Sequence, residues 1–305
     1  MKLLISLLRL IRFTNLVMIA FSMYLIRYMI VVPFLKEAET TSLLSAFHFS
    51  ILTLSVVLTA AGGYVINNYF DTGIDAVNKP GSNPVGELIS RKMSLFLYVM
   101  LTLGGIVSAV LFGESTGIRY AVLVVGMAAG LLYFYSSSYK KMLLAGNIII
   151  ALLAALNIFI TILFDKNALL STAVLVVVTA YTLFAFLLTL AREIIKDCED
   201  AAGDRAFGAN TLPVAAGIRT ARISAAAILL LASGALGYVQ FITEQWDDLI
   251  SFGYVSIFLQ LPLLILSYLT ATSKTDTSDR RNSTIAKGIM LAGLCSMIVF
   301  YLSFK

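Results

Sequence analysis

Hydrophobic residues along this chain gather into long runs that short polar segments separate. Nine of the runs are about as long as a bilayer is thick. They are residues 13–32, 42–66, 93–112, 119–135, 142–164, 169–191, 223–242, 249–271 and 285–304. Because a helix needs about 20 mainly apolar residues to cross a membrane, the pattern predicts an all-α bundle of nine transmembrane helices.

The composition excludes an ordinary soluble globule. Apolar residues make up 59% of the 305 residues and charged residues 13%, and the mean hydropathy is +0.92. A soluble domain carries about 25% charged residues. One bundle can use nearly the whole chain, so we expect residues 1–305 to form a single integral-membrane domain. The two cysteines, Cys198 and Cys295, predict neither a disulfide framework nor a metal knuckle.

Basic residues lie mainly in alternate connections between the runs. Of the 22 Lys and Arg residues, all but five fall on one predicted side of the bundle. The five exceptions are Arg27, Lys36, Arg119, Lys166 and Lys305. The positive-inside rule makes the basic side cytoplasmic, so the N-terminus and the long connections 67–92 and 197–222 are expected there. Because the charges form no single patch, the isoelectric point of about 9.1 does not indicate nucleic-acid binding.

Two acidic segments with matched spacing open these long connections. Each places polar residues at positions i, i+3 and i+7. They are Asn68, Asp71 and Asp75 in the first segment, and Asp197, Asp200 and Asp204 in the second. On a helix such positions share one face, so each segment predicts an oxygen-rich patch.

These patches have the chemistry of a magnesium site. Neighbouring carboxylates repel one another unless a cation lies between them, and Mg²⁺ is typically held by one or two carboxylates plus substrate phosphates. A single acidic segment could equally be a solvated helix end. Two matched segments at helix C-termini, where the backbone dipole disfavours anions, favour a diphosphate bridged by metal.

Basic and aromatic residues accompany the acidic segments. Lys140 and Lys141 end a tyrosine-rich segment, residues 133–141, and either flank a membrane span or hold phosphate oxygens. Its rings could stabilise a developing carbocation through their faces, although tyrosine also collects at membrane interfaces. Arg192, Glu193 and Lys196 occupy successive helical turns just before the second acidic segment, and Arg192 is the best candidate for a bidentate phosphate contact.

At these residues the chain resembles the UbiA superfamily of intramembrane prenyltransferases. That family has nine helices, an Asn-Asp-x-x-Asp-x-x-x-Asp motif after the second, a Tyr-rich segment with Lys after the fourth, and an Asp-rich motif after the sixth. Residues 67–75, 133–141 and 192–204 match these features, and the likeness covers nearly the whole chain. Residues 192–213 look most like the digeranylgeranylglyceryl phosphate synthase branch. The resemblance implies an all-α, nine-transmembrane-helix bundle of the UbiA prenyltransferase type.

The resemblance also implies roles for the polar residues. Two Mg²⁺ sites would be formed by Asn67, Asp71 and Asp75 and by Asp197, Asp200 and Asp204. Diphosphate contacts are expected from Asn67, Asn68, Lys140, Arg192, Lys196, Tyr139 and Arg12. Asn68 stands where the family usually has Asp, so it could bind metal through its amide oxygen or donate its NH₂ to the diphosphate. Asn83-Pro84 replaces a common Arg-Pro pair, which removes a basic contact.

The implied activity is Mg²⁺-dependent transfer of a polyprenyl group from its diphosphate to an acceptor through an allylic cation. The acceptor could be geranylgeranylglyceryl phosphate, an aromatic acid of quinone biosynthesis, or none, as in terpene cyclisation. A transporter or lipid-binding protein is the rival from another class, but it predicts a polar site at the midplane on broken helices. The expected partners are a prenyl diphosphate, a lipophilic acceptor and the bilayer, with no nucleic acid and no obligate protein partner.

Overall fold

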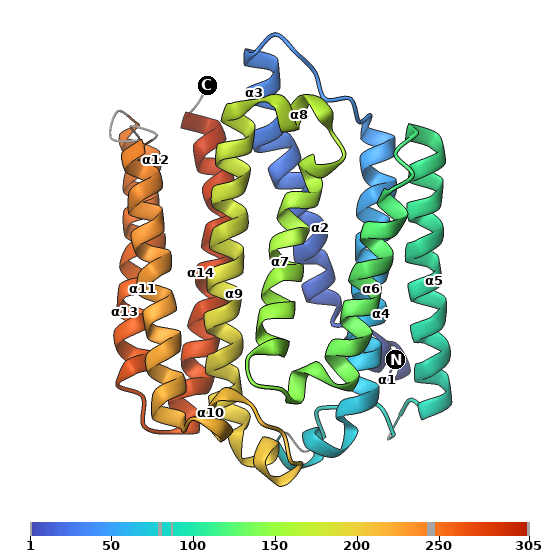
Figure 1. The fold of residues 1–305 in the computed structure, drawn as a ribbon, viewed down its shortest axis with the longest axis vertical. Helices are drawn as coiled ribbons and strands as arrows, with labels where there is room; N and C mark the ends of the chain where they lie inside the picture. Colours follow the sequence, from blue (N-terminus) through green and yellow to red (C-terminus); the bar gives the residue numbers. More distant parts are fainter. Residues whose placement is uncertain (1, 79–80, 87, 243–247, 304–305) are drawn as a thin grey trace. The chain divides into compact units, whose positions relative to one another are not determined.

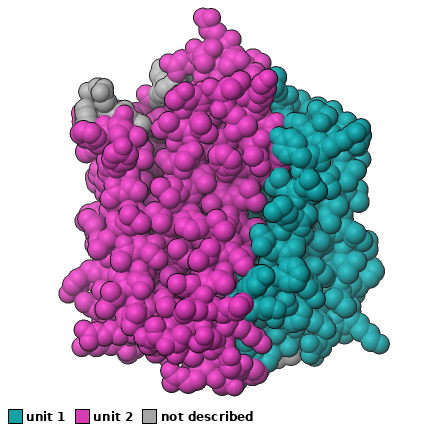
Figure 2. Space-filling view, viewed as in Figure 1, with its two compact units in different colours: residues 1–23, 43–140 teal, residues 24–42, 141–305 magenta. Residues whose placement is uncertain are grey.

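Helices make up the regular structure of residues 2–78, 81–86, 88–242 and 248–303, which the computed structural model describes (Figure 1). An isolated bridge between Val85 and Ile89 is the β pairing found there. The predicted all-α fold is confirmed. The chain divides into two compact units (Figure 2), of which unit 1 contains residues 1–23 and 43–140 and unit 2 contains residues 24–42 and 141–305.

Unit 1 is built mainly from three long helices. Its elements are α1 (Lys2–Leu10), most of α2 (Phe13–Leu25), α4 (Ala46–Asn78), α5 (Arg91–Thr116), α6 (Ala121–Ser137) and the start of the 3-10 turn η2 (Tyr139–Lys141). Glycines let α4 and α5 approach closely, because a side chain on Gly62 would collide with Thr102 and one on Gly105 would collide with Thr59. Close backbone approach through small residues is typical of membrane helices.

Unit 2 is organised around α9 (Thr172–Ala206), which packs against α7 (Ala145–Leu163), α11 (Ile218–Ile242) and α14 (Asp276–Ser303). Its remaining elements are η1 (Ile26–Val31), α3 (Val32–Glu37), α8 (Lys166–Leu170), α10 (Leu212–Ala215), α12 (Leu249–Val255), η4 (Ser256–Gln260) and α13 (Leu261–Ala271). Leu188 and Ile195 of α9 and Leu229 of α11 are fully buried in its core.

The helices reproduce the predicted membrane spans. In the described part of the chain, eight helical stretches are long and apolar enough to cross a membrane, and α6 is a shorter apolar helix. Two of the eight combine several elements: one joins α2, η1 and α3, and the other joins α12, η4 and α13. Together with α6 they match the nine predicted runs in order, and the chain is a multi-pass membrane protein.

Both composite spans contain a π-helical turn just before a proline. Pro33 follows η1 and Pro262 follows η4. A proline lacks the N–H that the helical ladder needs, and its ring collides with the carbonyl four residues earlier. A wider π turn before the proline relieves that collision, so each span continues past its proline.

The two long connections begin later than the sequence suggested. α4 continues to Asn78 and α9 to Ala206, so the acidic segments lie on helices of 33 and 35 residues rather than in loops. Apolar residues continue the buried face past the end of each predicted run, as Ile74 and Ala201 do. That continued stripe keeps the last turns helical.

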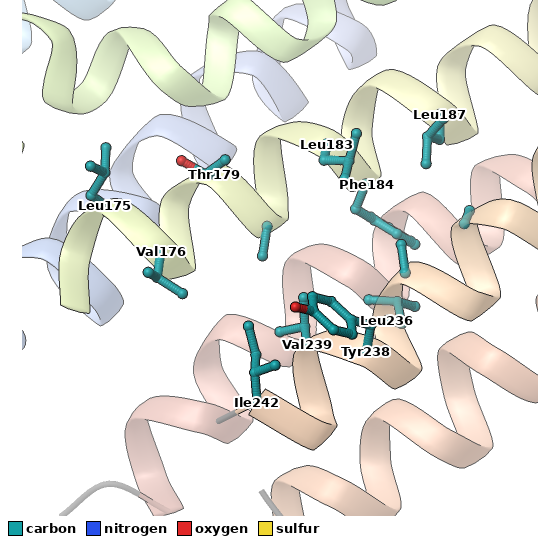
Figure 3. A pocket seen from close by; sticks show the side chains of 13 residues that line it. Leu175, Val176, Thr179, Leu183, Phe184, Leu187, Leu236, Tyr238, Val239 and Ile242 are labelled. Carbon is teal, nitrogen blue, oxygen red and sulfur yellow. The ribbon is translucent and has the colours of Figure 1, made fainter. Parts of the chain in front are cut away.

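An apolar groove of about 330 Å³ lies between α9 and α11 (Figure 3). Thr179 and Tyr238 bring the side-chain oxygens to a lining that otherwise consists of aliphatic residues and Phe184. On α9 the lining ends at Leu187, before the acidic segment begins. The groove therefore belongs to the apolar part of the span and not to the polar site.

Candidate functional site

The first acidic segment lies in the C-terminal turns of α4, within unit 1. Asn67, Asn68 and Asp71 are 9%, 8% and 9% exposed, while Asp75 is half-buried. Polar side chains buried to this degree need hydrogen-bond or ionic partners. The partners come from α1 and the turn after it, from η2 and from the segment after α4.

Two basic side chains reach this segment. The ammonium of Lys140 forms an ion pair with Oδ1 of Asp71, and both side chains are largely buried, at 17% and 12% exposed. Arg12 donates from Nη2 to Oδ1 of Asn67 over 3.2 Å, and its guanidinium lies 5.1 Å from the ring centre of Tyr64. The structure therefore brings two predicted diphosphate ligands to the first acidic segment.

Asn68 is fixed by both hydrogens of its amide. Its Nδ2 donates to the carbonyl of Leu10 over 3.1 Å and to the carbonyl of Tyr64 over 2.8 Å. Both acceptors are backbone carbonyl oxygens, which cannot donate, so the atom of the amide that faces them must be the nitrogen. Oδ1 then points away from these carbonyls, which leaves it as the atom of Asn68 suited to a metal ion.

Asn83 ties the segment after α4 back to the helix. Its Nδ2 donates over 2.8 Å both to the backbone carbonyl of Asn68 and to Oδ2 of Asp75, while its Oδ1 accepts from the backbone N–H of Val85 over 3.0 Å. From the sequence, Asn83 was expected only to remove a basic contact; in the structure it positions Asp75.

The second acidic segment lies in the C-terminal turns of α9, within unit 2. Oδ2 of Asp197 accepts a hydrogen bond of 2.7 Å from Nδ2 of Asn147, near the start of α7. Oδ2 of Asp204 accepts one of 3.0 Å from the hydroxyl of Thr211, the residue before α10. Neutral donors therefore hold two of the three carboxylates of the second segment.

Arg192 has the donor chemistry expected of an anion ligand. Its Nη1 contacts Oε1 of Glu193 at 2.5 Å, and both residues are largely buried. Its Nε is buried and has no hydrogen-bond partner among the described residues. A buried guanidinium N–H without a partner is costly, and a phosphate oxygen would satisfy it. Lys196 and Asp200, on the same helix, are half-buried.

Tyr139 belongs to a cluster of aromatic rings in unit 1. Its ring lies 6.2 Å from that of Phe134, which in turn packs edge-on to Tyr133 at 5.6 Å. Phe134 is 53% exposed and Tyr133 38%. Rings exposed in this way are typical of a membrane interface, so the direct role of Tyr139 with diphosphate stays a prediction.

The donors present fit Mg²⁺. Carboxylate oxygens, with amide oxygens in the first segment, are the hard ligands that this ion prefers, and cationic side chains lie beside both segments. Across the described residues, no three His, Cys, Asp or Glu side chains gather closely enough to hold a metal ion by themselves. Amide oxygens and a phosphate-bearing ligand would complete such a site.

Three supporting residues were not predicted from the sequence in their observed roles: Asn83, Asn147 and Thr211. The signal for Asn147 was present, because a polar amide within an apolar membrane run is unusual and often functional. Asn83 and Thr211 lie in connections whose path the sequence pattern does not determine.

The fold and the polar segments define a multi-pass helical membrane protein with two acidic helix ends. A family model described as the UbiA prenyltransferase family matches residues 16–291. The chain belongs to this family. A digeranylgeranylglyceryl phosphate synthase from Ignicoccus hospitalis is 35% identical over 259 residues, covering 82% of this chain and 80% of the relative. One from Methanothermobacter thermautotrophicus is 39% identical over 193 residues, and the match spans 61% of this chain and 63% of the relative.

Solved structures have the same fold. A structure of digeranylgeranylglyceryl phosphate synthase matches 99% of both chains with a TM-score of 0.69 at 23% identity. A UbiA homologue from Archaeoglobus fulgidus, bound to DMAPP and Mg²⁺, matches 96% of this chain and 99% of that one with a TM-score of 0.60 at 18% identity. The UbiA-type helical fold expected from the sequence is therefore confirmed, and the eight long apolar stretches and the shorter α6 of the described residues agree with nine expected spans.

Proposed function

We propose that this protein transfers a polyprenyl group from its diphosphate to a lipophilic acceptor, with Mg²⁺ as cofactor. The observation that carries the proposal is that α4 and α9 both end in acidic turns, each with a largely buried basic side chain on or near it. Lys140 is paired with Asp71 of the first segment, and Arg192 is paired with Glu193, just before the second. Membership of the UbiA prenyltransferase family supports the reaction class. The A. fulgidus homologue bound to DMAPP and Mg²⁺ supports the donor and the cofactor.

The acceptor we favour is geranylgeranylglyceryl phosphate. Relatives of 35–39% identity are named digeranylgeranylglyceryl phosphate synthases. An acceptor of that kind carries its own phosphate, and a site with several basic groups suits a donor and an acceptor that are both anionic. An aromatic acid as acceptor, or cyclisation without one, would use the same fold and remains the rival reaction.

The roles of the residues follow from their positions. Mg²⁺, when bound, neutralises the charge that collects on the leaving diphosphate. Lys140 and the unpartnered Nε of Arg192 donate to diphosphate oxygens, and these contacts strengthen as the C–O bond ionises. Asn83, Asn147 and Thr211 hold carboxylates in place. The apolar helix walls exclude water that would quench the allylic cation.

We further propose that the acidic helix ends and the N-terminus face the cytoplasm. The excess of Lys and Arg in alternate connections supports this orientation. Acidic residues at helix ends, rather than on broken helices at the midplane, argue against the transporter alternative.

The direct test is a transfer assay with the full chain in detergent or nanodiscs. Labelled prenyl diphosphates of several lengths are supplied with Mg²⁺ and with geranylgeranylglyceryl phosphate, an aromatic acid or no acceptor. We expect product only with the glyceryl phosphate, and Asp71→Asn or Asp200→Asn should lower the rate by about 100-fold or more. Asp276→Asn, an exposed change in α14, serves as the control. A labelled cyclic product formed with no acceptor consumed would instead indicate cyclisation.

A further inference from the structure

Asn147 connects the start of α7 to the second acidic segment. Its side-chain amide donates to Oδ2 of Asp197 over 2.7 Å, and it is only 7% exposed. We propose that Asn147 is a positioning residue, which orients the carboxylate of Asp197 so that Oδ1 is presented to Mg²⁺. This inference rests on the proposed function, because it assumes that Asp197 binds the metal.

The backbone around Asn147 is held at two points. Leu144 has a left-handed conformation, with φ 56° and ψ −18°, immediately before α7 begins. A conformation of this kind is uncommon for a residue with a branched side chain and persists where surrounding contacts impose it. The N–H of Ala145 donates across Leu144 to the carbonyl of Leu143 over 2.7 Å. Three residues before Leu144, the carbonyl of Lys141 accepts a hydrogen bond of 2.7 Å from the N–H of Asn210. The segment that delivers Asn147 is therefore fixed against the loop that follows α9.

The hydrogen bond limits how Asp197 can turn. The terminal torsion of an aspartate is broad, so a free carboxylate can rotate and can bind a metal through one oxygen or two. With Oδ2 bound to Asn147, the lone pairs of Oδ1 have a defined direction. A neutral amide does this without a charge that would compete with the metal. Hydrogen bonds that orient metal ligands typically contribute 10- to 100-fold to metal affinity.

A residue that only fills space would behave differently from one that donates a hydrogen bond. Leucine has nearly the shape of asparagine and cannot donate, so Asn147→Leu keeps the packing and removes the bond. Asn147→Ala removes both the packing and the hydrogen bond, and it is a second variant to measure if Asn147→Leu does not fold. Asn157→Leu changes the same residue type further along α7, beyond the reach of the acidic segment, and is the matched control.

The test measures Mn²⁺ binding to the full chain by electron paramagnetic resonance, with thermal melting of each variant. We expect Asn147→Leu and Asn147→Ala to weaken Mn²⁺ binding by about 10- to 100-fold, with Asn157→Leu like wild type. In an Asp197→Asn background, Asn147→Leu should cause no additional loss. If Asn147→Leu binds Mn²⁺ as tightly as wild type while wild type is active, the inference is wrong and the proposed function stands. If wild type binds no Mn²⁺ and transfers no prenyl group, both the positioning role of Asn147 and the proposed function are wrong.

Discussion

Lys140 is paired with Asp71 in the structure and is proposed to bind the diphosphate when substrate is present. Lys140→Met should raise the KM for prenyl diphosphate by about 10- to 100-fold, since a hydrogen bond to a charged group contributes about 1.5–3 kcal/mol. Mn²⁺ binding without diphosphate should become tighter, because the metal no longer competes with an ammonium for Asp71. Lys92→Met, an exposed lysine at the start of α5, is the control. An unchanged KM in Lys140→Met would contradict the assignment.

Asn68 differs from the usual aspartate of its family, and its hydrogen bonds give the reason in this chain. Aspartate at this position would direct a carboxylate at the carbonyls of Leu10 and Tyr64, where the amide now donates. We expect Asn68→Asp to lower the free energy of unfolding by about 1–3 kcal/mol, and to be less stable than Asn68→Ala, which lacks the repulsion. Thermal melting in detergent ranks the variants, and an Asn68→Asp protein as stable as wild type would refute this account.

At the scale of elements, the sequence predicted which segments are helices better than where they end. In the part of the chain that the structure describes, each of the nine apolar runs corresponds to a helical segment, because the length of a run decides whether a helix can cross a bilayer. α4 and α9 extend past the ends of the predicted runs, because buried apolar residues, Ile74 and Ala201, continue their apolar faces among the polar residues. The faces shared by the acidic residues follow from helical spacing. Asn147 and Thr211 do not, because their contacts depend on how separate helices and loops pack.

One buried ion pair connects α11 to α14. Asp279 is fully buried, and Arg222 contacts it from Nη2 at 2.5 Å and from Nε at 3.1 and 3.2 Å. Asp279→Ala should cost about 3–5 kcal/mol of stability, because it leaves a buried guanidinium without its counter-charge. The double variant Arg222→Met with Asp279→Leu should recover most of that loss. Melting temperatures of Asp279→Ala, of Arg222→Met and of the double variant test this. If the double variant loses as much stability as Asp279→Ala, the loss does not come from the unpaired guanidinium.

At the scale of the whole molecule, the distribution of charge predicts how the chain lies in the membrane. Connections rich in Lys and Arg alternate with connections poor in them along all nine spans. One missed or extra span would exchange the two sides for every later connection, so the regular alternation supports both the count and the orientation. The expected result is a cytoplasmic N-terminus, with both acidic helix ends on the same side.

Cysteine labelling tests that orientation. In a background with Cys198→Ser and Cys295→Ser, single cysteines replace Ser82, expected in the cytoplasm, and Glu114, expected outside; both positions are exposed. A maleimide that cannot cross membranes should label Glu114→Cys in intact cells, and Ser82→Cys only in inside-out vesicles or after permeabilisation. Ser138→Cys, exposed at the end of α6, is expected to follow Ser82→Cys because their connections lie two spans apart, and spans reverse direction each time they cross. Labelling of Ser82→Cys in intact cells, with protection of Glu114→Cys, would invert the orientation. Labelling of Ser82→Cys and Ser138→Cys from opposite sides would instead show that the number of spans between them is wrong.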